Sequence, residues 1–208
     1  NGYGHGVLPI AKSLDEADAL AVARVDEGVV LRQAGIGKKI LVLEGFFNRD
    51  ELLAAAKYGL STAIQQPEQI ELLRQQSINT PIECWLKVDT GMHRLGFAPD
   101  DAHSAWQALN ALPCVVDPPR LMTHFACADD LGDEATRKQM SRFRPVAEQL
   151  EVETSLANSA GIIGWPDAHA DWVRPGIMLY GASPMLDASG DRHGLRPVMT
   201  LQSRLIAI

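Results

Sequence analysis

The chain has 208 residues and a mass of 22.6 kDa, which is enough for one large domain or two small ones with a sizeable hydrophobic core. Hydrophobic residues make up 46% and charged residues 22%, which excludes a disordered or fibrous protein. The net charge of -7 argues against a nucleic-acid or anionic-membrane partner, and no apolar run approaches the roughly 18 to 20 residues of a membrane span.

The chain begins at Asn1 without an initiator methionine and without the basic and apolar regions of a signal peptide. The missing methionine leads us to expect a piece of a longer protein. The cysteines, Cys84, Cys114 and Cys127, are odd in number and show no CxxC spacing. We interpret them as reduced thiols of a cytoplasmic protein, with neither a disulfide framework nor a metal site.

The first predicted element is a helix over Val7–Leu14, and from there short apolar runs alternate with longer amphipathic segments. Runs such as Ile40–Leu43 are typical of buried parallel strands. Seven strands are predicted, at Leu20–Val25, Lys39–Leu43, Ser61–Gln65, Ile82–Val88, Arg120–Phe125, Thr154–Ala157 and Asp171–Tyr180. The helices between them are predicted at Glu27–Ala34, Asp50–Tyr58, Glu68–Gln75, Asp101–Leu112, Glu134–Leu150 and Gly161–Trp165.

Seven strands preceded by a helix are one strand short of the eight that close a (β/α)8 barrel. We therefore predict an α/β fold, a TIM-type barrel that lacks its first strand. Because such barrels typically need about 250 residues, a compact barrel without that strand also fits the length. An open doubly wound sheet is the alternative, and periodicity alone does not exclude it.

The end of the chain differs from the rest. Pro197–Ile208 alternates apolar and polar residues as an exposed strand does, and it follows a polar, turn-rich stretch at Asp187–Gly194. We expect residues 1–186 to form the barrel domain, incomplete at its N-terminus. Residues 187–208 would then provide a linker and the first strand of a truncated C-terminal β domain.

Function in a barrel gathers at the C-terminal ends of the strands. The loops after the last two predicted strands carry Ser159, whose hydroxyl suits a phosphate, and Gly176 and Ile177, which present backbone amides. Barrel phosphate sites commonly use these two loops, so the pattern favours a phosphate site here. A helix N-cap and a turn explain the same residues equally well.

Two other strand ends carry candidate functional side chains. Lys87 lies between Leu86 and Val88, and because burial makes its charge costly, it is either a Schiff-base nucleophile or a paired structural cation. Arg94 follows in a loop suited to clamping a carboxylate. His124 lies on an apolar strand, where a satisfied core histidine is the more common finding.

Four stretches in chain order resemble bacterial alanine racemase of the proteobacterial type. They are Asn1–Gly6 (NGYGHG), Lys87–Gly96 (KVDTGMHRLG), Thr123–Ala126 (THFA) and Trp172–Ile177 (WVRPGI). The resemblance extends along nearly the whole chain and implies a pyridoxal-phosphate enzyme with an N-terminal barrel and a C-terminal β domain. It also implies that the lysine carrying the cofactor precedes Asn1 by two places, which agrees with the missing first strand.

The resemblance implies how the cofactor phosphate is held. Tyr3 and Ser159 would hydrogen-bond the phosphate, together with the backbone amides of Gly176 and Ile177. Ser159, Gly176 and Ile177 are also the residues that the strand-end pattern favours for a phosphate site, and the resemblance adds Tyr3.

The resemblance also implies roles around the cofactor ring. His124 would pack against the pyridine and Arg174 would face its nitrogen. Because a guanidinium practically never gives up its proton, the ring is a weaker electron sink, which favours returning a proton to Cα over transamination. Arg94 would bind near the phenolate oxygen and the substrate carboxylate. Lys87, a carbamate in many members of the family, would orient Arg94, and Asn158 would lie near the same network.

The reaction that the resemblance implies is the racemisation of alanine, which supplies D-alanine for peptidoglycan, in a head-to-tail homodimer. Its two bases would be the lysine before Asn1 and a tyrosine of the partner's C-terminal domain, so we expect these residues alone to be inactive. Three alternatives stay open: a non-catalytic pyridoxal-phosphate-binding barrel of the cofactor-homeostasis type, a scaffold without a ligand, and a racemase for serine or several amino acids. The strand predicted at Pro197–Ile208 argues against the first.

Overall fold

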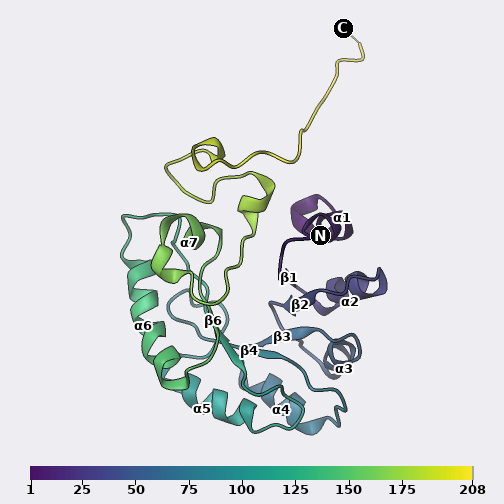
Figure 1. The fold of residues 1–208 in the computed structure, drawn as a ribbon, viewed down its shortest axis with the longest axis vertical. Helices are drawn as coiled ribbons and strands as arrows, with labels where there is room; N and C mark the ends of the chain where they lie inside the picture. Colours follow the sequence, from purple (N-terminus) through teal and green to yellow (C-terminus); the bar gives the residue numbers. More distant parts are fainter. Residues whose placement is uncertain (208) are drawn as a thin grey trace.

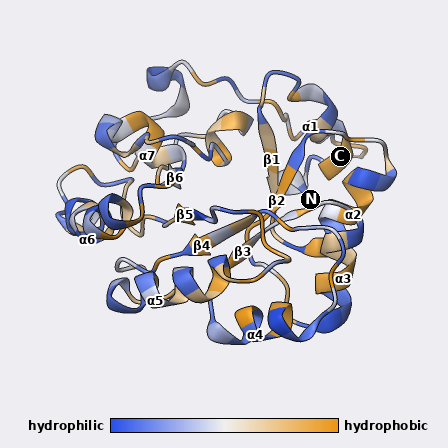
Figure 2. Ribbon diagram, turned by 60° about the horizontal axis from the view of Figure 1, so that its bottom comes forward, coloured by the Kyte–Doolittle hydropathy of each residue, from blue (hydrophilic) through white to orange (hydrophobic). Residues whose placement is uncertain are grey.

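A computed structural model describes residues 1–207 and shows a parallel sheet that curls round with its helices on the outer side (Figure 1, Figure 2). Its six strands are β1 (Ala19–Val22), β2 (Lys39–Val42), β3 (Ser61–Ile64), β4 (Cys84–Lys87), β5 (Arg120–Met122) and β6 (Thr154–Ser155). The strands lie in chain order from β1 to β6, and every neighbouring pair is parallel. A doubly wound sheet reverses its strand order, so this sequential order excludes that alternative and confirms the TIM-type α/β class.

The helices of residues 1–207 alternate with the strands. They are α1 (Val7–Ser13), α2 (Val25–Gln33), α3 (Arg49–Lys57), α4 (Pro67–Gln75), α5 (Pro99–Asn110), α6 (Ala135–Leu150) and α7 (Ser159–Gly164), with short 3-10 helices η1 (Gly2–Gly4), η2 (Pro166–Ala168), η3 (Ile177–Tyr180) and η4 (Gly190–His193). Local chemistry sets several of their starts. Asn48 caps α3 by accepting a hydrogen bond from the Glu51 amide at 2.9 Å. Pro67 and Pro99 begin α4 and α5, where a missing N–H costs nothing.

The sheet is buried on both faces at β3 and β4, whereas β1 and β2 each have one exposed residue. Every residue of β3 and β4 is buried, as expected for parallel strands covered on two sides. Because side chains alternate along a strand, Cys84 and Leu86 join the main core, whereas Trp85 joins a smaller cluster with Ala63 and Met122. The main core therefore lies between sheet and helices, and the smaller cluster lies on the concave side of the sheet.

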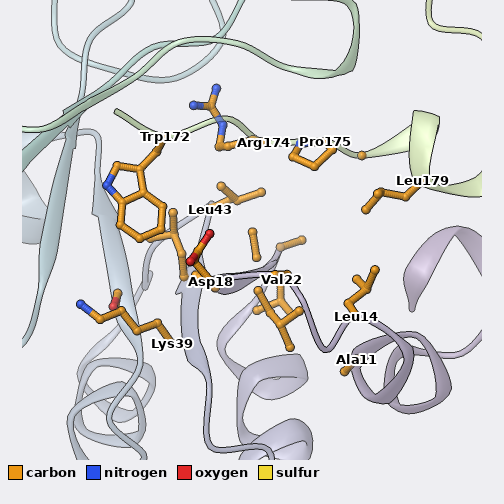
Figure 3. Close-up of a pocket in the computed structure, with 18 of the residues that line it drawn as sticks. Ala11, Leu14, Asp18, Val22, Lys39, Leu43, Trp172, Arg174, Pro175 and Leu179 are labelled. Carbon is orange, nitrogen blue, oxygen red and sulfur yellow. The ribbon is translucent and has the colours of Figure 1, made fainter. Parts of the chain in front are cut away.

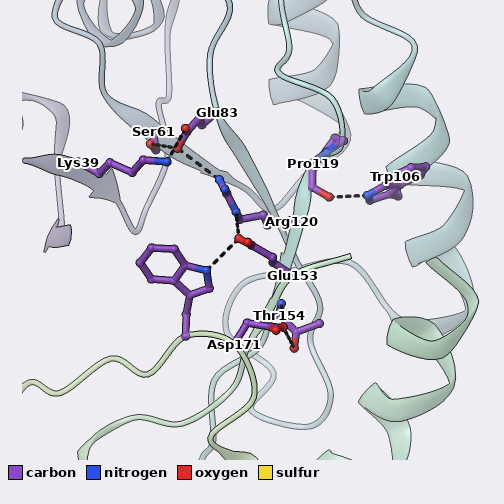
Figure 4. A network of polar contacts seen from close by, with 10 residues as sticks. Lys39, Ser61, Glu83, Trp106, Pro119, Arg120, Glu153, Thr154 and Asp171 are labelled. Carbon is purple, nitrogen blue, oxygen red and sulfur yellow. Dashed lines mark hydrogen bonds and ion pairs between the residues drawn. The ribbon is translucent and has the colours of Figure 1, made fainter. Parts of the chain in front are cut away.

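Charged residues near the N-terminal ends of the strands form one network (Figure 4). Glu83 accepts from Lys39 at 2.8 Å and from Arg120 at 3.3 Å. Arg120 also donates to Glu153 at 2.5 Å, and the Trp172 indole donates to the same carboxylate at 2.9 Å. The network ties four strand starts together at the end of the sheet opposite to the one where the candidate residues lie.

The strand predicted at Asp171–Tyr180 is wrong for most of its length. Trp172 forms a single bridge with Ser155 beside β6, and the chain then enters the 3-10 helix η3. Pro175 has no amide hydrogen for a ladder, and Gly176 adopts a ψ of -98°, so the chain leaves the sheet there. The apolar residues of η3 produced the strand-like pattern.

The strand predicted at Pro197–Ile208 is not observed. Residues 197–207 form neither helix nor strand, and Ile208 lies outside the described residues. Leu201 and Ile206 are 97% and 100% exposed, so within residues 1–207 the alternating side chains have no surface to pack on. None of the helices within residues 1–207 is long and apolar enough to cross a membrane.

Candidate functional site

A cavity of about 630 Å³ runs between β1 and the segment 172–180 (Figure 3). Helix α1 and strand β1 supply its apolar wall, and Arg174 and Pro175 lie on the opposite side. Of the predicted site residues, Tyr3, Arg174 and Gly176 line it. The others lie on β4, at the starts of α7 and η3, and on the loops that follow β4, β5 and β6.

The predicted phosphate-binding residues meet at the start of α7. The Ser159 hydroxyl accepts from the Gly176 amide at 2.8 Å and from the Met178 amide at 3.4 Å. A Cβ added at Gly176 would lie 3.0 Å from the Tyr3 hydroxyl and 3.8 Å from the Ser159 hydroxyl. The two hydroxyls and the Gly176 backbone therefore surround one small space, and Ile177 begins η3 beside it.

Asn158 also has a structural role here. Its side chain caps α7 by accepting from the Gly161 amide at 2.9 Å. The helix N-cap that the sequence allowed as an alternative is therefore present, but Asn158 provides it. The Ser159 hydroxyl instead contacts the segment that contains Gly176.

Aromatic side chains cover one edge of this space. The Tyr3 ring lies 4.9 Å from the Tyr180 ring, and the His5 ring lies 4.7 Å from it. Burial and the neighbouring Tyr3 hydroxyl raise the pKa of the Tyr180 phenol. Tyr180 does not stand out in the sequence because it ends an ordinary apolar run.

The Arg174 guanidinium is held by backbone at the ends of β5 and β6. It donates to the Thr123 carbonyl at 2.6 Å and to the Leu156 carbonyl at 3.2 Å, and it also hydrogen-bonds the Ser155 hydroxyl. Burial lowers its pKa to about 10, so the guanidinium remains protonated near neutral pH. The His124 ring nitrogen Nδ1 lies 3.5 Å from it.

Three cationic groups gather around His124. Lys87 is a buried residue at the end of β4, and burial, followed by the charges of Arg94 and Arg174, lowers its pKa to about 8. Burial and then the charges of Arg174, Lys87 and Arg94 lower the pKa of His124 to about 4. Arg94 itself is exposed and forms no ion pair within residues 1–207. Such a cluster favours an anionic ligand.

We expect His124 of the ligand-free chain to titrate near pH 4, well below its ordinary value of 6.5. Because the unfolded chain takes up this proton first, the free energy of unfolding should fall by about 3 kcal/mol as the pH drops from 6.5 to 4. Histidine NMR signals recorded against pH, with H124Q to assign the signal, measure the pKa directly. Titration at the ordinary value would contradict this picture of the cluster.

Comparisons with known proteins match the chain along its whole length. The family profile described as "Alanine racemase, N-terminal domain" matches residues 1–184. Proteins named alanine racemase from Shewanella sediminis and Aeromonas hydrophila are 44% and 46% identical to it over 208 residues, which is all of this chain and 58% of each relative. The chain thus spans little more than half the length of these relatives.

Solved structures give the same result. The biosynthetic alanine racemase from Pseudomonas aeruginosa superposes with a TM-score of 0.90 at 40% identity, over 95% of this chain and 55% of that one. The alanine racemase from Acinetobacter baumannii superposes with a TM-score of 0.87 at 34% identity, over 95% and 56% of the two chains.

Proposed function

This chain belongs to the alanine racemase family, and we propose that it forms the cofactor-binding barrel of a cytoplasmic enzyme that interconverts L- and D-alanine. The observation that carries the proposal is the meeting of the Tyr3 hydroxyl, the Ser159 hydroxyl and the Gly176 backbone around one small space. Two hydroxyls and a close backbone, beside a cluster of cations, are the donors that a phosphate dianion needs.

The residues present fit pyridoxal 5′-phosphate as the cofactor. Tyr3, Ser159 and the amides of Gly176 and Ile177 would hold its phosphate, and a Cβ at Gly176 would intrude on that space. His124, kept neutral by its low pKa, offers an uncharged face for the ring. When bound, this cofactor supplies an electron sink that eases removal of the Cα proton of an amino acid.

Arg174 would set how strong that electron sink is. Its pKa of about 10 keeps the proton on the guanidinium at neutral pH, so Arg174 would donate a hydrogen bond to the ring nitrogen without transferring a proton. A weaker electron sink favours return of the proton to Cα. The backbone contacts at Thr123 and Leu156 hold this guanidinium in place.

Arg94 would bind the substrate carboxylate, and Lys87 would orient Arg94. The pKa of about 8 leaves part of the Lys87 amine neutral near pH 7, which permits reaction with carbon dioxide to give a carbamate. A carbamate would reverse the charge beside Arg94 and pair with it. The native mass of protein equilibrated with bicarbonate at neutral pH, compared with that of K87R, shows whether Lys87 carries the added carboxyl group. Asn158 would lie near the same network.

The two catalytic bases are proposed to come from outside residues 1–208, one from a lysine preceding Asn1 and one from a tyrosine of the partner subunit in a head-to-tail homodimer. Residues 1–186 would form the barrel domain, and residues 187–208 would lead into a C-terminal β domain. We therefore expect the isolated 208-residue chain, given cofactor, to form no D-alanine. Turnover by this chain at the rate of a full-length enzyme would contradict that arrangement.

The proposal is tested by cofactor binding to the full-length protein. We expect a visible absorption band with pyridoxal phosphate, racemisation of alanine, and an affinity that falls roughly 10- to 100-fold in S159A because a hydrogen bond to a charged group is lost. S141A removes an exposed hydroxyl on α6 and is the matched control. Pyridoxal without its phosphate should bind S159A and the unsubstituted protein equally. Absence of binding, or an equal loss for both compounds, would overturn the assignment.

A further inference from the structure

A glutamine on α6 lies beneath the candidate site. Gln139 is 1% exposed, and both ends of its side-chain amide are used. Its oxygen accepts from the Ala126 amide at 2.9 Å. Its nitrogen donates to the His124 carbonyl at 2.9 Å and to the Thr90 hydroxyl at 3.1 Å. One side chain thus contacts the segments that follow two different strands, β4 and β5.

The hydrogen bonds beyond Gln139 run in one direction. The Thr123 hydroxyl donates to the Val88 carbonyl at 2.8 Å, which uses its only hydrogen. The Thr90 hydroxyl, 2.8 Å from that of Thr123, must then be the donor between the two. Thr90 in turn accepts from Gln139, so the series of hydrogen bonds runs from Gln139 through Thr90 and Thr123 to the Val88 carbonyl, directly after β4. A residue that cannot donate at position 139 breaks this series at its start.

The anchored segments carry two residues of the proposed site. Thr90 begins the loop that leads to Arg94, and the carbonyl held by Gln139 belongs to His124 itself. A second α6 side chain, Arg142, donates to the Thr90 carbonyl at 3.0 Å. Helix α6 therefore holds the Arg94 loop and the His124 backbone against each other.

We propose that Gln139 is a positioning residue that sets His124 and Arg94 relative to one another, through its hydrogen bonds to the His124 carbonyl, the Ala126 amide and the Thr90 hydroxyl. The inference rests on the proposed function of this site. None of the four stretches that resemble the family contains Gln139, and its hydrogen bonds go to Ala126, His124 and Thr90 of this chain. Its effect on the reaction passes through the backbone that it holds.

The chain contains a matched control for this role. Gln69 on α4 is also fully buried, accepts from the Gln65 amide at 2.8 Å and donates to the Phe46 carbonyl at 3.0 Å. It ties the segments after β2 and β3 in the way that Gln139 ties those after β4 and β5. None of the proposed site residues lies on the segments held by Gln69. A substitution of Gln69 therefore measures the effect of losing such a buried tie on stability, apart from any effect on the site.

The test compares Q139E with Q69E in the full-length enzyme carrying pyridoxal phosphate. A carboxylate keeps the oxygen acceptor but loses the donated bonds, two at Gln139 and one at Gln69. We expect kcat for alanine to fall at least tenfold in Q139E, with a changed visible circular dichroism band, whereas Q69E stays within about twofold despite a loss of thermal stability. Hydrogen exchange in the ligand-free protein should quicken across residues 90–94 only in Q139E, whereas the Ala126 amide keeps its acceptor.

A milder pair of variants covers the case in which Q139E does not fold. T90V removes the hydroxyl that links Gln139 to Thr123, and T90S keeps it, so activity and the dichroism band should be altered in the first and restored in the second. Equal effects in Q139E and Q69E, or in T90V and T90S, would overturn the positioning role. Failure of the unsubstituted protein to bind cofactor or racemise alanine would instead overturn the proposed function.

Discussion

Replacing Gly96 by alanine is expected to lower the free energy of unfolding by about 3 kcal/mol. Gly96 has a φ of +127°, a region that side chains rarely adopt. A Cβ there would lie 2.7 Å from the Asp89 amide nitrogen and 3.0 Å from the Lys87 carbonyl oxygen. Both are backbone atoms at the end of β4, so neither can move without displacing the strand.

The G96A substitution should also disturb the candidate site, because Gly96 lies at the end of the loop that carries Arg94. Immediately after Gly96, Phe97 donates to the Lys87 carbonyl at 2.9 Å and accepts from the Asp89 amide at 2.8 Å. The methyl group added in G96A would break these two hydrogen bonds and move the loop away from β4.

Urea unfolding of G96A and of the control G59A separates the cost of backbone strain from the cost of the close contact between the added Cβ and β4. Gly59 has a φ of +58°, but an added Cβ there meets nothing within 4 Å. G59A should therefore cost only the conformational strain, about 1 kcal/mol. Equal losses in the two variants would show that the close approach to β4 contributes nothing.

The regular elements were predictable because buried parallel strands and amphipathic helices have distinct patterns. The strand predicted at Lys39–Leu43 is observed at Lys39–Val42, and the helix predicted at Glu134–Leu150 is observed at Ala135–Leu150. The pattern failed at Asp171–Tyr180, because an apolar run that packs as a 3-10 helix has the same composition as a short strand. It failed at the C-terminal end because alternation indicates a strand only where a partner strand is present.

The candidate site was predictable as far as it depends on strand ends. In a parallel sheet the C-terminal ends lie together, so Lys87, His124 and Ser159 were expected near one another. Gln139 was not predictable, because a glutamine in an amphipathic helix resembles any solvated residue until packing buries it. Two of the partners of Arg174 are backbone carbonyls, of Thr123 and Leu156, and a backbone acceptor cannot be recognised from the identity of its residue.

Replacing Arg174 by leucine is expected to lower the free energy of unfolding by about 3 kcal/mol, because the carbonyls of Thr123 and Leu156 lose their donor in a partly buried place. The control is Arg137 on α6, an exposed arginine that pairs with Glu134 across one helical turn and lies 5.1 Å from the centre of the Trp165 ring. R137L should cost about 1 kcal/mol or less. Thermal unfolding of both variants measures the difference.

The same substitution should raise the pKa of His124, since the Arg174 charge is the largest contribution to its lowering after burial. Burial remains, so the new value should lie between 4 and 6.5. R174Q also removes the charge and should raise the pKa likewise. R174K keeps a positive charge but cannot reach every acceptor from one nitrogen, so it should lose stability while the His124 pKa stays low. NMR titration of His124 in the three variants measures this contribution. An unchanged pKa in all of them would mean that burial and the charges of Lys87 and Arg94 keep this imidazole neutral without Arg174, and that Arg174 acts on the site only through the backbone it holds.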